Sequence, residues 1–191
     1  MGALRVMADE EGLHIVPNRV TVSTAGVVPK IRELARVPER PHLAISLAAP
    51  TDELRDRLVP INNRWPLEEL LAACMEFVES LRPGERFTFE YVMLDGVNDS
   101  DEQARQLANL LNRHQLRAKV NLIPHNPADE LPYRPSPEGR VESFKAILEA
   151  KGVHAFVRRP RGRDIYAACG QLAARRPANN LNPQMLHQLT G

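Results

Sequence analysis

The chain has few cysteines and no long apolar run, and both absences limit the kind of protein it can be. Its 191 residues include two cysteines, Cys74 and Cys169, and no C-x-x-C pair. This is too few for the disulfide framework of a small secreted protein. The sequence has no charged-then-apolar leader and no run of about 18 apolar residues, the length that a membrane-spanning helix needs. We therefore expect a soluble protein of the reducing cytoplasm.

Common motifs for nucleotides and metals are also missing. The sequence contains no G-x-G-x-x-G, no G-K-[ST] loop and no H-E-x-x-H, and its six histidines are scattered without ligand spacing. We therefore predict no metal site within the chain. The 25 Lys and Arg residues nearly balance the 24 Asp and Glu residues, which gives a net charge of +1. Any surface for nucleic acid must therefore be local.

The sequence does contain a regular alternation of strand and helix patterns. β-branched or apolar runs of strand length lie at residues 19–23, 43–47, 86–94, 119–124 and 154–158. Helical patterns are expected at 3–11, 27–36, 52–58, 66–81, from about 100 onward and at 138–150. No hairpin turn joins neighbouring strands, so the pattern predicts parallel βα units in one α/β domain. Because a full eight-stranded barrel takes about 250 residues, we expect a partial or open barrel.

One strand pattern is nearly continuous in its apolar character. Residues 43–47 read L-A-I-S-L, as in a strand that is covered on both faces of a parallel sheet. Cys74 lies on the apolar stripe of the helix that Pro66 opens, so we predict that its thiol belongs to the core. Glu90 is an acid inside a strand, and either a lining position or a surface position would explain it.

Polar side chains follow several of the predicted strands where each strand ends. They are Ser23, Ser46, Asn126 and Cys169. Ligands of parallel α/β folds lie at the carboxyl ends of the strands, so these residues are candidate ligand contacts. Each of them taken alone is more often a helix cap or a turn residue. The proline-rich loop from His125 to Pro137 is long for a simple connection and is a candidate binding loop.

The segment 161–172, R-G-R-D-I-Y-A-A-C-G-Q-L, is the strongest candidate for chemistry. Gly170 allows a sharp backbone turn that would hold the Cys169 thiol out from a loop. Four guanidinium groups lie within six residues and suit the phosphates of RNA; they belong to Arg158, Arg159, Arg161 and Arg163. The alternatives are a buried cysteine and a solvated arginine surface. We expect the polar tail at 173–191 to be loosely ordered.

The motifs taken together resemble one known family. In chain order, from about Leu4 to Leu172, they are V-T-V-S-T-A-G-V-V-P, L-A-I-S-L, D-E-L-R-D-R-L-V-P-I-N, F-E-Y-V-M-L-D-G-V-N-D, N-L-I-P-H-N-P and R-P-R-G-R-D-I-Y-A-A-C-G-Q-L. This series resembles the RlmN family of radical S-adenosylmethionine enzymes, the dual-specificity ribosomal- and transfer-RNA adenine-C2 methyltransferases. The resemblance implies that residues 1–172 form a partial (βα) barrel of the radical-SAM type that lacks its N-terminal strands. The related Cfr family, which methylates adenine at carbon 8, shares the cysteine loop and is the nearest alternative.

The resemblance also implies a cofactor set and a role for one cysteine. Family members use S-adenosylmethionine and a [4Fe–4S] cluster with an external electron donor, and they act as monomers on 23S rRNA and tRNA. The cysteine that matches Cys169 takes a methyl group from one S-adenosylmethionine. A radical derived from a second S-adenosylmethionine activates this group for addition to adenine, and a second cysteine then releases the RNA by forming a disulfide. The positions that match cofactor contacts are Ser23, Ser46, Leu47, Ala48 and Asn126.

The sequence departs from the family pattern in ways that affect activity. The family's C-x-x-x-C-x-x-C cluster motif, its G-E-P motif, its resolving cysteine and its N-terminal RNA-binding accessory domain have no counterpart in these 191 residues. Ala48 stands where the family usually has histidine. We therefore interpret the chain as the C-terminal portion of such an enzyme, inactive by itself. The alternative is a non-catalytic remnant that binds RNA or S-adenosylmethionine weakly.

Overall fold

A five-stranded, wholly parallel sheet is the centre of the fold. The computed structural model describes residues 6–7, 9, 13–38, 40–116, 118–127 and 132–158. Each strand pairs in parallel with the next one along the chain, so the order in the sheet is β1-β2-β3-β4-β5. The strands are β1 (Thr21–Thr24), β2 (His42–Ser46), β3 (Phe87–Met93), β4 (Lys119–Pro124) and β5 (Ala155–Val157). This confirms the predicted α/β class with parallel βα units.

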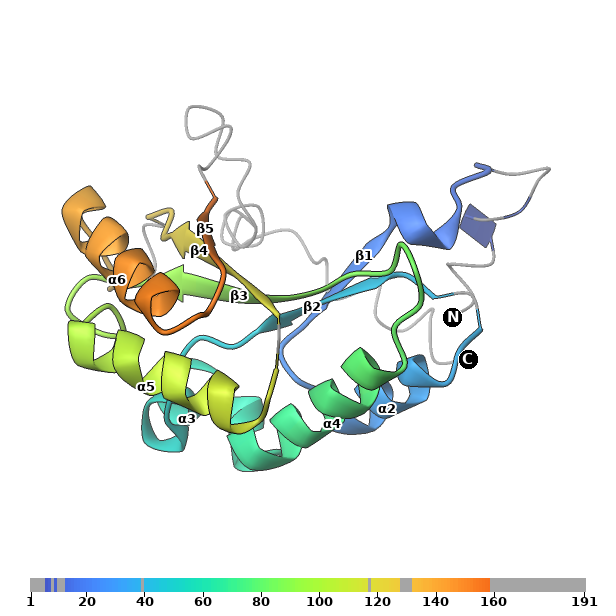
Figure 1. Ribbon diagram of the computed structural model, residues 1–191, viewed down its shortest axis with the longest axis horizontal. Coiled ribbons are helices and arrows are strands. Elements are labelled where there is room, and N and C mark those ends of the chain that lie inside the picture. The colour runs from blue at the N-terminus through green and yellow to red at the C-terminus, as the bar shows by residue number, and fades with distance from the viewer. Residues whose placement is uncertain are drawn as a thin grey trace, which may run out of the picture.

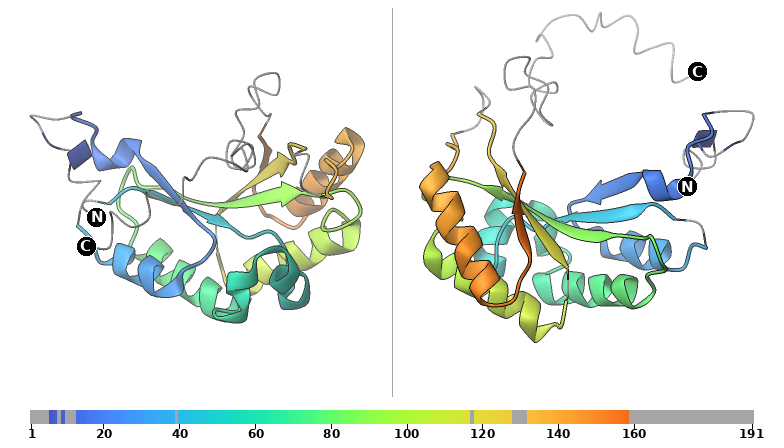
Figure 2. Two further views of the ribbon diagram at one scale, coloured as in Figure 1. Left: turned by 180° about the vertical axis from the view of Figure 1, so that it is seen from behind. Right: turned by 45° about the horizontal axis from the view of Figure 1, so that its top comes forward.

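The helices that connect these strands cover one face of the sheet (Figures 1 and 2). They are α2 (Val28–Ala35), α3 (Asp52–Leu58), α4 (Leu67–Glu79), α5 (Asp101–Arg113) and α6 (Glu138–Ala150). Two short 3₁₀ helices, η1 (Pro17–Arg19) and η2 (Pro60–Asn63), were not predicted. Of the helix expected at 3–11, only a few residues are described, and Val6 and Met7 among them are helical. In the described ranges no helix is long and apolar enough to span a membrane.

Local signals fix where two of the helices begin. The Thr51 side chain accepts a hydrogen bond from the Leu54 amide at 3.5 Å, which caps α3. Ser100 caps α5 through a reciprocal capping box, in which its hydroxyl accepts from the Gln103 amide while the Gln103 side chain accepts from the Ser100 amide. Such caps satisfy backbone N–H groups that have no partner inside the helix. Both helices therefore begin where the sequence predicts.

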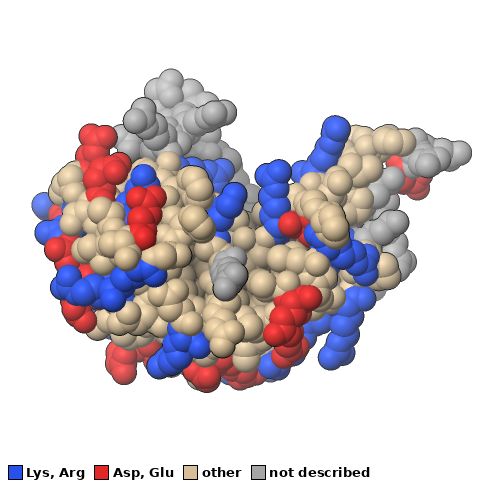
Figure 3. Space-filling model, in the orientation of Figure 1, with Lys and Arg blue, Asp and Glu red and all other residues tan. Residues whose placement is uncertain are grey.

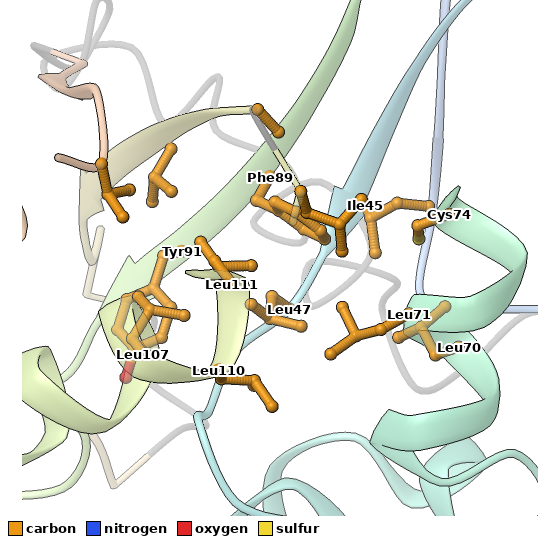
Figure 4. Packing of buried hydrophobic residues seen from close by; sticks show 14 of the residues in the cluster. Ile45, Leu47, Leu70, Leu71, Cys74, Phe89, Tyr91, Leu107, Leu110 and Leu111 are labelled. Carbon is orange, nitrogen blue, oxygen red and sulfur yellow. The ribbon is translucent and has the colours of Figure 1, made fainter. Parts of the chain in front are cut away.

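The hydrophobic core lies between the sheet and these helices (Figure 4). Apolar side chains from β2 and β3 point toward those of α4 and α5; the labelled residues are Ile45, Leu47, Leu70, Leu71, Cys74, Phe89, Tyr91, Leu107, Leu110 and Leu111. The described helices lie over one face of β2. On the other face Ala44 is buried as well, with 2% of its surface exposed, since it is a small side chain between Ser23 and Thr88 in register. The prediction that β2 is covered on both faces therefore stays a prediction.

Cys74 is a core residue, as the apolar stripe of α4 predicts. It is fully buried, and burial raises the pKa of its thiol to about 12. Because the thiolate is the reactive form, the folded protein protects this cysteine. We expect that, in a Cys169→Ser variant, Cys74 resists a disulfide reagent such as DTNB at mildly alkaline pH and reacts at once in concentrated guanidinium chloride. Rapid labelling of the folded variant would show that the α4 face is open.

Candidate functional site

The sheet face opposite the helices, which we name the open face, carries most of the polar candidates. The strand register places Ser23 beside Ala44, and Ser46 beside Glu90, which in turn lies beside Asn121. Ser23 is exposed and Ser46 half-buried, and both lie on this face of neighbouring strands. Figure 3 shows a depression at the top of the view, above the sheet, with Lys and Arg side chains on both sides of it. The open face is therefore the place where the described chain offers polar groups to a ligand.

A buried arginine joins the carboxyl ends of β1 and β2. Arg55 of α3 is fully buried, and its guanidinium group donates to main-chain oxygens from both connections. Nε donates to the Leu47 carbonyl at 2.9 Å, and Nη2 donates to the carbonyls of Ala25 at 2.6 Å and Ser46 at 3.3 Å. The planar fork of arginine allows one side chain to hold several acceptors in fixed directions. Arg55 thereby fixes the backbone of two predicted cofactor contacts, Ser46 and Leu47.

An asparagine links this arginine to two carboxylates. Arg55 Nη1 donates to Asn62 Oδ1 at 2.7 Å, and Asn62 Nδ2 donates to Asp52 Oδ1 at 2.8 Å and to Asp56 Oδ1 at 2.7 Å. Burial lowers the pKa of Arg55, and the nearby carboxylates oppose that shift. A buried charge is tolerated only where charge and hydrogen bonds compensate it. Gly26 allows this approach: its φ is +115°, and a Cβ there would lie 3.3 Å from Arg55 Nη2.

A second buried amide joins the ends of β2 and β3. Asn98 is fully buried; its Nδ2 donates to the Ala48 carbonyl at 2.9 Å and to the Val92 carbonyl at 2.7 Å, and its Oδ1 accepts from the Leu94 amide at 2.8 Å. Ala48 has a φ of +65°, which is uncommon for a residue with a side chain and is a feature of functional sites. Asn98 thus supports an unusual backbone conformation at a predicted cofactor contact.

The described part of the proline-rich loop lies against the end of β3. The Asp95 amide donates to the Arg134 carbonyl at 2.9 Å, and the Ser136 hydroxyl donates to Asp99 Oδ2 at 2.7 Å. A bridge also pairs Leu94 with Pro135. Residues 128–131 lie outside the described ranges. The structure therefore anchors the carboxyl half of the loop, and its role in binding stays a prediction.

Two residues just after β4 carry buried polar atoms that have no hydrogen-bond partner among the described residues. They are His125, at Nε2, and Asn126, at Oδ1. The His125 amide donates to the Met93 carbonyl at 3.3 Å, which holds this turn against β3, and burial lowers the pKa of the imidazole. An unsatisfied amide oxygen in a native structure calls for an explanation such as a ligand. The Asn126 oxygen is suited to accept a hydrogen bond from an N–H or O–H donor of a ligand.

The segment 161–172, which the sequence singles out for chemistry, lies outside the described residues, which end at Arg158. Arg158 is the one described member of the arginine group; its side chain is 70% exposed, and its Nη1 lies 4.0 Å from Glu90 Oε2. Arg159, Arg161, Arg163 and Cys169 lie outside the described residues. Their predicted roles as RNA contacts and methyl carrier therefore stay predictions.

The described residues do not fit an iron–sulfur cluster. Within the described ranges no group of three or more His, Cys, Asp or Glu side chains could hold a metal ion. Cys74, the described cysteine, is buried in the core. A [4Fe–4S] cluster needs cysteine thiolates as ligands. The described residues therefore supply no ligand set for a cluster.

Sequence reasoning missed the residues that hold the site together. Arg55, Asn62 and Asn98 have polar side chains in a short helix and two turns, where polarity alone indicates surface. Local spacing gives no sign of a buried arginine, because its acceptors come from residues far apart in the chain. One signal was available in the sequence. The segment that follows β2 is unusually rich in charged and polar residues, and it reads D-E-L-R-D-R-L-V-P-I-N.

Curated proteins and solved structures that resemble this chain are of one type. A scan against family models finds no match. The chain is 51% identical over 162 residues to a probable dual-specificity RNA methyltransferase RlmN of Koribacter versatilis. The aligned region covers 85% of this chain and 46% of that protein. It is also 51% identical over 175 residues to a probable dual-specificity RNA methyltransferase RlmN of Symbiobacterium thermophilum, and this alignment covers 91% of this chain and 46% of that protein. This chain therefore spans about half the length of the curated relatives that it matches.

Solved structures support the same conclusion about the fold. A radical SAM methyltransferase from Sphaerobacter thermophilus superposes with a TM-score of 0.82 at 50% identity, over 87% of this chain and 48% of that chain. A domain of pyruvate-formate lyase-activating enzyme from Bacteroides vulgatus superposes with a TM-score of 0.56 at 17% identity, over 73% of this chain and 80% of that domain. The second match bears on fold alone. The described sheet and helices form part of a radical SAM fold, as predicted.

Proposed function

We propose a function that starts from the membership of this chain in the RlmN family of dual-specificity RNA methyltransferases. The chain is part of an enzyme that methylates adenine at carbon 2 in 23S rRNA and tRNA. In this proposal the chain supplies part of an S-adenosylmethionine site and the methyl-carrying cysteine, Cys169. The arginines beside that cysteine hold the RNA backbone, since guanidinium groups bind phosphates. Bound S-adenosylmethionine would supply the methyl group.

The observation that carries the cofactor part of this proposal is the buried, unpartnered oxygen of Asn126. It follows β4 at the carboxyl edge of the sheet, where ligands of parallel α/β folds bind. Ser46 and Leu47 lie at the same edge of β2, with their carbonyls fixed by Arg55. These groups are therefore held in place before a ligand arrives, which reduces the entropic cost of binding.

The residues have distinct tasks in the proposed site. Asn126 accepts a hydrogen bond from the cofactor through Oδ1, and Ser23 and Ser46 offer hydroxyl groups from the open face. Leu47 and Ala48 shape the end of β2 through their backbone. Together they hold the cofactor in one orientation beside the segment that carries Cys169. Orientation is what the protein contributes when the cofactor supplies the chemistry.

Replacing Asn126 by alanine tests the cofactor site. We expect the 191-residue chain to bind S-adenosylmethionine in a saturable manner by calorimetry, and Asn126→Ala to weaken that binding about tenfold, the usual effect of losing one hydrogen bond of about 1.4 kcal/mol. Asn109→Ala is the matched control, since Asn109 is an exposed asparagine on α5. Equal affinities in the two variants, or no saturable binding, would contradict the assignment.

A further inference from the structure

Glu90 is the most unusual polar residue of the open face. It lies in the middle of β3, with Ser46 of β2 on one side and Asn121 of β4 on the other. Its side chain is 14% exposed, although no described helix covers this face. The proposed function gives no role to this carboxylate, which is mostly buried on a face that no described helix covers.

The two oxygens of this carboxylate have different surroundings. Oε1 accepts from Asn121 Nδ2 at 2.8 Å and from the Thr88 hydroxyl at 3.2 Å, so it is satisfied and held in direction. Oε2 is buried and has no hydrogen-bond partner. Among the described residues, the ion pair of this oxygen is with Arg158, whose Nη1 lies 4.0 Å away, beyond hydrogen-bond distance, and whose side chain is 70% exposed. Oε2 of Glu90 is therefore an acceptor held in a fixed direction, with no donor at hydrogen-bond distance among the described residues.

The chemistry of this oxygen restricts what can bind it. A carboxylate accepts hydrogen bonds and repels anions, so a phosphate or another carboxylate does not suit this position. A hydroxyl or amino group suits it, and hydrogen bonds to an ionised acceptor are stronger than those between neutral groups. The neighbouring Ser46 is a proposed cofactor contact, and the two residues are directly in register on parallel strands. A ligand that reaches Ser46 therefore also lies over Glu90.

We infer that Glu90 is a binding residue for an adenosyl group, whose hydroxyl or amino donor bonds to Oε2 while Asn121 and Thr88 fix the carboxylate from the other side. The identity of the ligand rests on the proposed function; the acceptor geometry does not. An adenosyl group can come from two sources here. One is S-adenosylmethionine, and the other is the target adenosine of an RNA.

The variant Glu90→Gln tests this inference in the 191-residue chain. Glutamine keeps the shape and can still accept from Asn121, but it replaces the free acceptor by an N–H donor that opposes the ligand's donor. We expect the variant to bind S-adenosylmethionine about 10- to 100-fold more weakly, the range for a hydrogen bond to a charged group. The control is Glu79→Gln, which removes the same charge from an exposed position at the end of α4.

A spectroscopic readout separates binding from a merely structural role. The Asn121 side-chain amide donates to Glu90, so its NMR signals report on that carboxylate. We expect S-adenosylmethionine to shift these signals in the unmodified chain and in Glu79→Gln, and to leave them unshifted in Glu90→Gln. A short adenosine-containing RNA forms the second arm. If Glu90→Gln weakens binding of the RNA and not of S-adenosylmethionine, the target adenosine is the donor. The Asn121 signals of the unmodified chain should then shift when that RNA is added.

The outcomes distinguish this inference from the proposed function. If Asn126→Ala weakens binding while Glu90→Gln matches Glu79→Gln in both arms, the role of Glu90 is overturned and the cofactor site stands. If Glu90→Gln weakens binding while Asn126→Ala does not, the inference stands and the proposed cofactor contact fails. If the unmodified chain binds neither ligand, both are overturned.

Discussion

Replacing Arg55 by methionine should lower the free energy of unfolding by about 3 to 5 kcal/mol, the range for removing one partner of a buried charged network. Methionine has a similar length but no donor. The carbonyls of Ala25, Ser46 and Leu47 would lose their guanidinium partner. Each buried acceptor left without a donor carries its own desolvation cost. Chemical denaturation monitored by circular dichroism measures the loss directly.

Two further variants make this prediction specific. Arg57→Met is the matched control, because Arg57 is exposed on the same helix, and a surface substitution of this kind changes stability by about 0.5 kcal/mol or less. Arg55→Lys keeps the charge but not the planar fork, so we expect it to retain part of the stability. It also keeps the prediction testable if the methionine variant does not fold. Equal denaturation midpoints for Arg55→Met and Arg57→Met would contradict the role of this network.

The positions of strands and helices followed from the sequence because their signals are local. The apolar periods of α4 and α5 and the caps at Thr51 and Ser100 each lie within one element. The parallel direction of the strands followed from the absence of hairpin turns. The side of β2 on which the helices lie did not follow from the sequence, because an apolar run of five residues does not show which side a helix covers. Ala44, on the face away from the described helices, is apolar and buried as well.

The candidate site was predicted less completely than the fold. The strand ends located Ser46 and Asn126, since the carboxyl edge of a parallel sheet is known once the strands are known. The roles of Arg55 and Asn98 depend on carbonyls that fold close to them from other elements. Glu90 had two interpretations from the sequence. The register with Ser46 and Asn121 decides in favour of a lining position.

Replacing Cys169 by alanine should remove all detectable methylation at carbon 2 of adenine. In the proposed function this thiol carries the methyl group to the RNA, so a side chain without sulfur leaves no route for transfer. The thiol is part of the covalent path, so we expect complete loss and not a modest change in affinity. Cys74→Ala is the matched control. Its thiol is buried in the core, so we expect activity to remain and only stability to fall, by about 1 kcal/mol as for the loss of a small buried group.

The most direct test is to quantify 2-methyladenosine by mass spectrometry in 23S rRNA and tRNA. The host is a bacterial strain whose own adenine-C2 methyltransferase gene has been deleted, and it expresses this gene with any coding sequence that precedes it in frame. We predict that the unmodified gene and Cys74→Ala restore 2-methyladenosine, whereas Cys169→Ala does not. Undiminished 2-methyladenosine in Cys169→Ala would contradict the account, as would 8-methyladenosine as the sole product of the unmodified gene.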